Sequence, residues 1–138
     1  MARLSQHRSL CIFVAALMAL PALSTVSLAD AVVGVWQTEP DRKQLTSHIE
    51  VRQCGPRLCG RILRAFTPVG EEVRTRHVGK ELFWDMVSLG DGRYDGGTVY
   101  VPLLNVTAKA SMRLLGDRLR VRGCKGVVCD GQVWTRVR

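Results

Sequence analysis

Four cysteines carry the most distinctive chemistry in this sequence, and they form two pairs with the spacing Cys-x4-Cys: Cys54 with Cys59, and Cys124 with Cys129. Cysteines that hold zinc are usually spaced Cys-x2-Cys and belong to reducing compartments. An even number of cysteines in an oxidising compartment predicts disulfides. We therefore expect two local disulfides and no metal site, while the sequence leaves open a cross-pairing between the two pairs.

Two histidines and a few carboxylates are the remaining groups that could act in catalysis. We expect His48 on the outer face of one strand and His77 in another, and neither lies in a known nucleophile motif. The carboxylates of Glu71-Glu72, Asp91 and Asp95 belong to turn-like segments, where solvated carboxylates are usual. The sequence also has no glycine-rich phosphate loop. It predicts no catalytic residue and no cofactor, so an enzyme is the least supported class of function.

The first 29 residues have the pattern of a secretory leader. Arg3 and Arg8 precede an apolar run at 10–20, which is too short to cross a bilayer, and Pro21 ends the run. Small residues follow at 27–29, so we predict cleavage after Ala29 and a periplasmic or secreted location. The alternative is a retained membrane anchor. We expect residues 30–138 to form a single domain.

The net charge favours anionic partners. Arg3 and Arg8 account for two of the 20 Lys and Arg, which leaves 18 against 12 Asp and Glu, a net charge of +6. Such a charge attracts phospholipid headgroups, lipopolysaccharide and other anions. Nucleic acid is not an expected partner for an exported protein. A charge that serves only solubility is the alternative.

The pattern of residues 30–138 is that of an all-β fold. Apolar and polar residues alternate, and turn residues recur about every ten positions. We predict strands at 32–37, 47–54, 59–64, 72–78, 83–89, 97–101, 106–115 and 118–123 and a last strand through Trp134, with turns at Asp91-Gly92, Gly96-Gly97 and Gly116-Asp117. About eight strands are enough to close a small antiparallel barrel.

The hairpin around Gly116-Asp117 has a well-specified register, because a slip of one residue would mix its two faces. The predicted pairs are Leu115 with Arg118, Leu114 with Leu119, Arg113 with Arg120, Met112 with Val121 and Ser111 with Arg122. One face is apolar. The other gathers four arginines, and we regard them as candidate anion-binding residues: Arg113, Arg118, Arg120 and Arg122.

Each cysteine pair is expected to lie across a four-residue loop and to fix the register of a hairpin. With Cys124 opposite Cys129, Leu119 faces Trp134 and Val121 faces Gln132, which places Trp134 on the core face. With Cys54 opposite Cys59, Val51 faces Ile62, and Arg52 faces Arg61 on the outside. The second pairing would create another like-charge pair.

Two resemblances refine this interpretation. Gly34-Val35-Trp36 resembles the Gly-x-Trp that opens the first strand of lipocalin-like barrels, in which a late arginine stacks on the tryptophan. Arg136, on the core face with Trp134, could serve; the alternative is Arg138. We interpret Gly34, Trp36, Trp134 and Arg136 as structural residues.

The chain also resembles the exported bacterial family called domain of unknown function 2147. The matching segments are 34–36, 49–54, 58–62, 76–79, 96–100, 119–124 and 133–137. The resemblance implies a lipocalin-like barrel and no known activity. The chain departs from the family pattern at 68–72 and at 100–105, which puts in doubt any role that the usual acidic and glycine residues have there.

Two kinds of binding therefore compete. A small apolar or amphipathic ligand could enter the barrel, with Arg76, Phe83, Trp84, Tyr100 and Met112, and also Leu82 and Met86, as candidate lining. The alternative is that the apolar side chains among these simply fill a small core. Alternatively, the basic outer face could meet an anionic surface of the cell envelope. The sequence does not indicate the oligomeric state.

Overall fold

The computed structural model describes residues 30–138, and the leader predicted at 1–29 lies outside them. The regular structure of the described residues consists of β-strands. Among these residues there is no helix long and apolar enough to span a membrane. The strands are β1 (Gly34–Gln37), β2 (Thr46–Cys54), β3 (Arg57–Phe66), β4 (Glu72–Val73), β5 (Glu81–Gly90), β6 (Arg93–Val101), β7 (Val106–Leu115), β8 (Arg118–Lys125) and β9 (Val128–Arg136).

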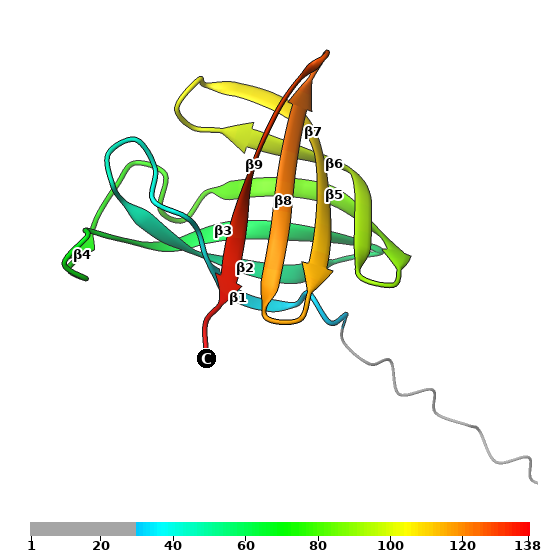
Figure 1. Ribbon diagram of the computed structural model, residues 1–138, viewed down its shortest axis with the longest axis horizontal. Helices are drawn as coiled ribbons and strands as arrows, with labels where there is room; N and C mark the ends of the chain where they lie inside the picture. The colour runs from blue at the N-terminus through cyan, green and yellow to red at the C-terminus, as the bar shows by residue number, and fades with distance from the viewer. Residues whose placement is uncertain (1–29) are drawn as a thin grey trace, which may run out of the picture.

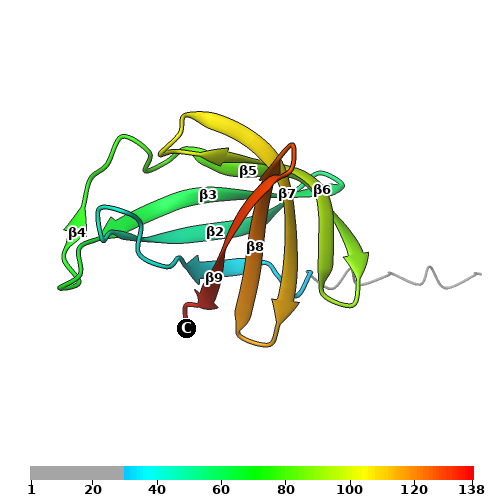
Figure 2. The same ribbon diagram turned by 45° about the horizontal axis from the view of Figure 1, so that its top comes forward.

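The strands close into the predicted antiparallel barrel (Figures 1 and 2). Each strand from β5 to β8 pairs with the next along the chain, β1 joins β9 to β2, and β2 and β5 both pair with β3. The short β4 adds to β3 outside this ring. Connections at 38–45, 67–80 and 102–105 gather at one end, which we call the open end. The turns at 55–56, 91–92 and 116–117 and residues 30–33 form the other, which we call the closed end.

Both hairpins of the last three strands have the predicted register. Arg113 lies opposite Arg120, and Met112 lies opposite Val121. Leu119 lies opposite Trp134, and Cys124 lies opposite Cys129, to which it is bonded. The predicted local pairing is also correct for the other cysteines, because Cys54 is bonded to Cys59.

The predicted register of the hairpin that contains Cys54 and Cys59 is wrong by two residues. Arg52 lies opposite Cys59, and Cys54 lies opposite Arg57, so the disulfide joins diagonal positions. The turn consists of Gly55-Pro56 alone, with Gly55 at φ 61°, and a glycine at the first central position favours a two-residue hairpin turn. The predicted pair of Arg52 with Arg61 does not exist: Arg61 lies opposite Glu50.

Two further predictions require correction. The strand predicted at 72–78 is limited to Glu72–Val73, and His77 lies in a turn instead of a strand. Gly96 and Gly97 do not form a turn but lie inside β6, which begins at Arg93 directly after the correctly predicted Asp91-Gly92 turn. The register between β6 and β7 shifts between Tyr94 and Gly97, so the glycines accommodate an irregularity within the strand.

The interior of the barrel is filled by side chains. The core contains Val32, Trp36, Ile49, Val51, Leu58, Ile62, Leu82, Phe83, Met86, Tyr94, Val99, Ala110, Met112, Leu119, Val121 and Trp134. Phe83 packs so close to the backbone of Gly60 that a Cβ atom there would overlap its ring. The tilted rings of Phe83 and Trp134 have centroids 6.5 Å apart. The volume inside the ring of strands is therefore a packed core.

The closed end is held by the predicted contact between Trp36 and Arg136. The guanidinium carbon of Arg136 lies 4.2 Å from the centroid of the Trp36 ring, and the two residues are cross-strand neighbours. The same guanidinium donates hydrogen bonds to the carbonyls of Ala31 (2.6 Å) and Val33 (3.3 Å). The indole of Trp36 donates to the Val32 carbonyl (2.9 Å). Arg136 thus ties the segment before β1 to the last strand.

Asp30 anchors the start of the described chain to β6. The Tyr94 hydroxyl donates a hydrogen bond to its carboxylate (2.5 Å), and the Val32 amide donates another (3.1 Å). Partial burial favours the neutral acid, but these hydrogen bonds hold the pKa of Asp30 below its usual value. Burial and the neighbouring carboxylate raise the pKa of Tyr94, so its hydroxyl stays protonated and can donate.

Candidate functional site

A cluster of arginines covers the outer face of three neighbouring strands. Arg113 on β7 lies directly opposite Arg120 on β8 and, on its other side, directly opposite Arg93 on β6. Arg118 and Arg122 lie on β8 to either side of Arg120. All five side chains are exposed. We call Arg93, Arg113, Arg118, Arg120 and Arg122 the basic face.

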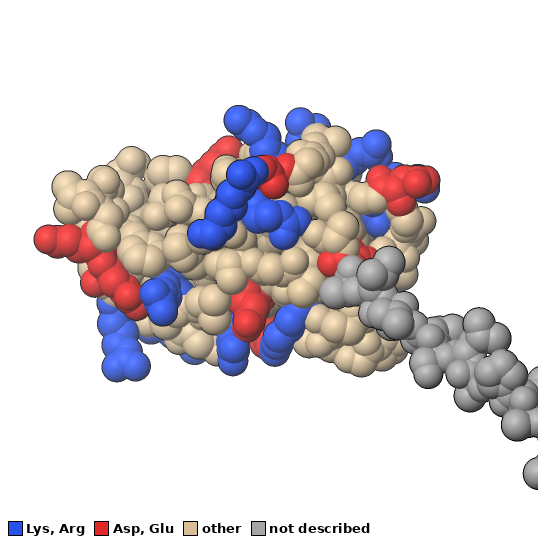
Figure 3. All heavy atoms as spheres, turned by 90° about the horizontal axis from the view of Figure 1, so that it is seen from below, with Lys and Arg blue, Asp and Glu red and all other residues tan. Residues whose placement is uncertain are grey.

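The basic face forms no ion pair within the described part of the chain. None of its five guanidinium groups forms an ion pair or a side-chain hydrogen bond there. Some arginines elsewhere are paired: Arg52 with Glu81, Arg61 with Glu50, and Arg138 with Asp117. Figure 3 shows acidic and basic side chains interspersed on the underside of the barrel. What distinguishes the basic face is that its arginines lie directly opposite one another on neighbouring strands.

Sequence reasoning predicted four of these arginines and missed Arg93. The four lie on one hairpin, whose turn fixes their pairing. Arg93 is placed beside Arg113 by the β6–β7 pairing, whose register depends on the irregularity near Gly97. The Asp91-Gly92 turn, which starts β6 at Arg93, was the only available signal.

The candidate ligand-lining residues are divided between the core and the open end. Phe83 and Met112 are buried in the core, as are Leu82 and Met86. Trp84 and Tyr100 are half-buried, and Arg76 is exposed in the turn before β5. The structure does not gather them around one cavity. Their role in binding stays a prediction.

Arg76 and Tyr100 do meet at His77. The Arg76 Nε atom donates a hydrogen bond to Nε2 of His77 (3.2 Å), and the His77 ring lies 6.0 Å from that of Tyr100. Burial and the charges of Arg76, Lys80 and Lys43 lower the pKa of His77, so it is neutral at pH 7. Its Nδ1 atom is buried without a hydrogen-bond partner among the described residues.

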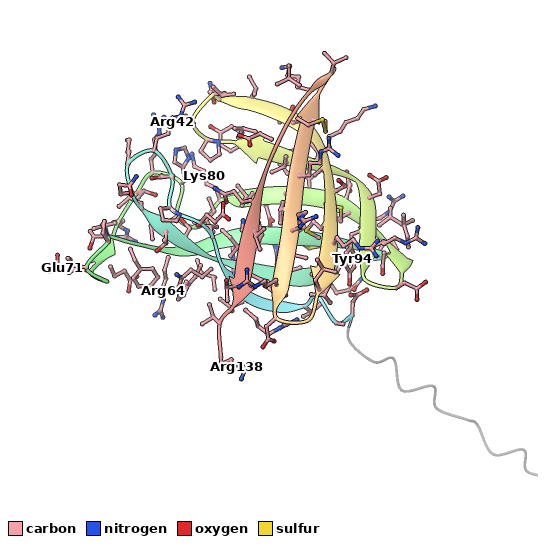
Figure 4. The ribbon with its side chains drawn as sticks, in the orientation of Figure 1. Arg42, Arg64, Glu71, Lys80, Tyr94 and Arg138 are labelled. Atoms are coloured by element: carbon pink, nitrogen blue, oxygen red, sulfur yellow. A yellow bond between two sulfur atoms is a disulfide. The ribbon has the colours of Figure 1, made fainter. Side chains whose placement is uncertain are left out.

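An open pocket of about 490 Å³ lies at the open end. His48 and Phe66 form one wall, with ring centroids 4.6 Å apart, and burial together with the nearby Arg64 lowers the pKa of His48. The remaining lining is neutral and polar or proline: Gln37, Pro40, Gln44, Thr46, Thr67, Pro68 and Gly70. Figure 4 shows Arg64 and Glu71 at this end, remote from Tyr94.

A smaller pocket of about 300 Å³ lies on the outside of β8 and β9, between Glu39 and Val133. Neither pocket is lined by the buried aromatic residues of the core. Residues 30–138 contain no group of three or more His, Cys, Asp or Glu side chains arranged to hold a metal ion. The described residues therefore offer two features for binding, the unpaired guanidinium groups of the basic face and the pocket at the open end.

The sequence matches the family described as "Uncharacterized protein conserved in bacteria (DUF2147)" over residues 34–136. No curated protein matches the sequence of this chain. Among solved structures, protein HP1028 of Helicobacter pylori, described as belonging to the lipocalin family, is similar in fold. The two share 14% sequence identity and a TM-score of 0.61, over 77% of this chain and 82% of that one. The similarity establishes a lipocalin-like fold.

Proposed function

We propose that this lipocalin-like barrel binds anionic lipid headgroups through its basic face. The chain belongs to the DUF2147 family of uncharacterised bacterial proteins. The observation that carries the proposal is the row of Arg93, Arg113 and Arg120 on three adjacent strands without a carboxylate partner. The guanidinium group is suited to phosphate because it offers several donors in a planar fork. A lipid surface presents many phosphates at once.

The strength of the expected binding follows from the number of exposed arginines. Each basic residue close to an anionic membrane contributes about 1 kcal/mol. The five arginines of the basic face would contribute up to about 5 kcal/mol, which is enough for reversible association with a bilayer but not for permanent anchoring. Because the attraction is electrostatic, salt should weaken it.

The predicted leader supports an envelope location for this activity. Cleavage after Ala29 would deliver residues 30–138 to the periplasm or beyond, where anionic lipid surfaces are abundant. The packed interior also supports the proposal over binding inside the barrel, since core side chains occupy the space that an internal ligand would need.

A vesicle sedimentation assay with matched variants tests the proposal. The protein is mixed with vesicles of phosphatidylglycerol and phosphatidylcholine at low and high salt. An Arg113→Gln, Arg120→Gln double variant removes two charges from the basic face. An Arg42→Gln, Arg64→Gln double variant removes two exposed charges at the open end, away from that face, and serves as the control.

We expect the native protein to bind at low salt and to be released at high salt. The face variant should bind about 30-fold more weakly, from the loss of about 2 kcal/mol, while the control variant keeps most of its affinity. Equal losses of affinity in the two variants would show that the net charge of the protein, and not the basic face, causes the binding. The same assay is repeated with lipopolysaccharide, another surface that carries phosphate groups. Binding to lipopolysaccharide but not to phospholipid vesicles would contradict the proposal of phospholipid headgroups as the ligand.

The open-end pocket supports a second candidate function, the binding of a small molecule. Its His48–Phe66 wall and neutral hydrogen-bonding groups would suit a compact ligand that is partly apolar. Native mass spectrometry of protein purified from the envelope of its host would detect a retained ligand as added mass. A Phe66→Ala variant should lose that mass, and protein free of any ligand would argue against this candidate.

A further inference from the structure

One edge of the barrel wall is left without a neighbouring strand. β9 pairs with β8 from Val128 to Thr135, but it pairs with β1 only at Thr135 and Arg136. After Gln37 the chain leaves β9, and the Thr38 amide bonds to the carbonyl of Ser47 instead. Figures 1 and 2 show the part of β9 next to the β8–β9 turn with β8 on one side and no strand on the other. We call residues 129–133 the free edge.

The hydrogen-bond pattern shows which backbone groups face outward. The Arg136 amide donates toward β8, to the carbonyl of Asp117, and the Val137 amide donates toward β1, to the carbonyl of Val35. Because the direction alternates along a strand, the N–H and C=O groups of Cys129, Gly131 and Val133 point to the free edge. Only the Gly131 amide has a partner there within the described residues, the Asp130 side chain (2.8 Å).

The free edge lacks the usual protection against strand pairing. Exposed edges generally carry charged residues, proline or a covering loop, whereas residues 129–133 read Cys-Asp-Gly-Gln-Val, with Asp130 as the one charged residue. The adjoining turn presents Val127 and Val128, which are 100% and 72% exposed. The pocket between Glu39 and Val133 leaves a hollow beside the edge. An additional strand could therefore approach the backbone of β9.

We propose that the free edge pairs with the same edge of a second copy of this chain, antiparallel and centred on Gly131. The two Gly131 residues face each other, so no side chains collide at the centre. Cys129 then lies opposite Val133 of the other copy on the outer side, and Asp130 lies opposite Gln132, whose amide can donate to the carboxylate. Three such facing pairs provide about six backbone hydrogen bonds, once each Gly131 amide exchanges its own Asp130 side chain for the Gly131 carbonyl of the other copy.

Charge complementarity favours a second copy over an acidic peptide as the occupant. An acidic strand would be attracted by Arg120 and Arg122, but it would meet Glu39 and Asp130 along the same hollow. A second copy adds only one carboxylate, Asp130, to the edge, and it has an amide opposite. Gly131 lies across from Arg122 within each copy, so the two Arg122 residues are separated by three strand spacings, or about 14 Å.

This separation determines how the dimer should respond to salt. About 14 Å exceeds the screening length of about 8 Å at physiological ionic strength, so repulsion between the basic faces is weak there and grows at low salt. Both basic faces would lie on the same side of one continuous sheet. The pairing is small compared with a standard interface of about 1,600 Å², so we expect a dissociation constant on the order of 0.1 mM.

Sedimentation velocity of the chain after leader removal, from about 0.01 to 1 mM, tests the proposal together with a Val133→Pro variant. The Val133 amide faces away from β8, so proline removes a donor that the monomer does not use. We expect at least about tenfold weaker dimerisation in this variant and tighter dimerisation of the native chain as salt rises from low to physiological. A native chain that stays monomeric across this range, or a folded variant that dimerises equally well, would overturn the proposal.

Amide hydrogen exchange of the native chain provides a readout that does not depend on any variant. The amides of Cys129 and Val133 should exchange more slowly as the protein concentration rises, while the amide of Val127, in the turn, should not change. Unchanged exchange at both positions in samples that do dimerise would assign the interface elsewhere. Protection that arises only on adding polyglutamate would assign the edge to an acidic partner. Either result would refute the self-pairing.

Discussion

Replacing Arg136 with methionine should destabilise the barrel far more than the same change at Arg138. Methionine keeps the apolar length of the side chain and removes the guanidinium. The stacking on Trp36 at 4.2 Å is worth about 1 kcal/mol, and each hydrogen bond to the Ala31 and Val33 carbonyls adds about 1 kcal/mol. The expected loss is therefore about 3 kcal/mol, a large share of a typical domain stability of about 5–15 kcal/mol.

The assay is urea unfolding of the chain after leader removal, followed by tryptophan fluorescence. With a slope of about 1.5 kcal/mol per molar urea, the Arg136→Met midpoint should fall by about 2 M. Arg138→Met is the matched control, since this arginine also pairs with Asp117 but its side chain is 82% exposed against 24% for Arg136. Exposed ion pairs contribute about 0–1 kcal/mol. Similar midpoint shifts in the two variants would refute the assignment of Arg136 as the residue that holds the closed end.

Three other perturbations test the core, the start of the chain and the disulfides. Gly60→Ala should cost about 1–3 kcal/mol of unfolding free energy, because its Cβ would overlap the Phe83 ring, and adding Phe83→Leu should recover part of the loss. Tyr94→Phe should cost about 1–3 kcal/mol at pH 7 by leaving the Asp30 carboxylate without its donor. Because the pKa of Asp30 is lowered in the folded state, the stability that its ionised carboxylate contributes is present above the unfolded pKa near 3.9 and is lost as the pH falls through the folded pKa. The difference in unfolding free energy between the native chain and Tyr94→Phe should therefore become smaller in acid. Reduction of both disulfides should lower the unfolding free energy by about 4 kcal/mol, about 2 kcal/mol for each short loop, and unfolding curves that coincide with and without reductant would contradict it.

Two of the hairpins show what alternation can and cannot predict. Around Gly116-Asp117, a one-residue slip would move every apolar side chain to the wrong face, so the pattern excludes it and the predicted register is correct. In the hairpin that contains Cys54 and Cys59, the register error is two residues, and a shift of two residues keeps every side chain on its own face of the sheet. Val51 opposite Gly60 satisfies the pattern as well as Val51 opposite Ile62 does. Only the backbone of the Gly55-Pro56 turn decides between them.

The same reasoning explains how much of the candidate site could be predicted. The four arginines of the β7–β8 hairpin follow from a tight turn and strict alternation. Arg93 belongs to a strand pair joined by the longer connection 102–105, with an irregularity that shifts the pairing, and no local signal encodes that shift. The free edge of β9 was equally out of reach, because it depends on where β1 ends and on the Thr38 amide bonding to β2.

The basic face is difficult to explain by folding alone. β7 and β8 contain no Asp or Glu, and Arg113 faces an arginine on both sides, whereas Arg61 faces Glu50 on the neighbouring strand. Like charges directly opposite each other cost up to about 1 kcal/mol per pair, less where they are solvated. A carboxylate at any one position of the row would turn this cost into a cross-strand ion pair without altering the core. A negatively charged partner from outside the chain would supply that missing charge, and the row would then serve binding at a modest expense in stability.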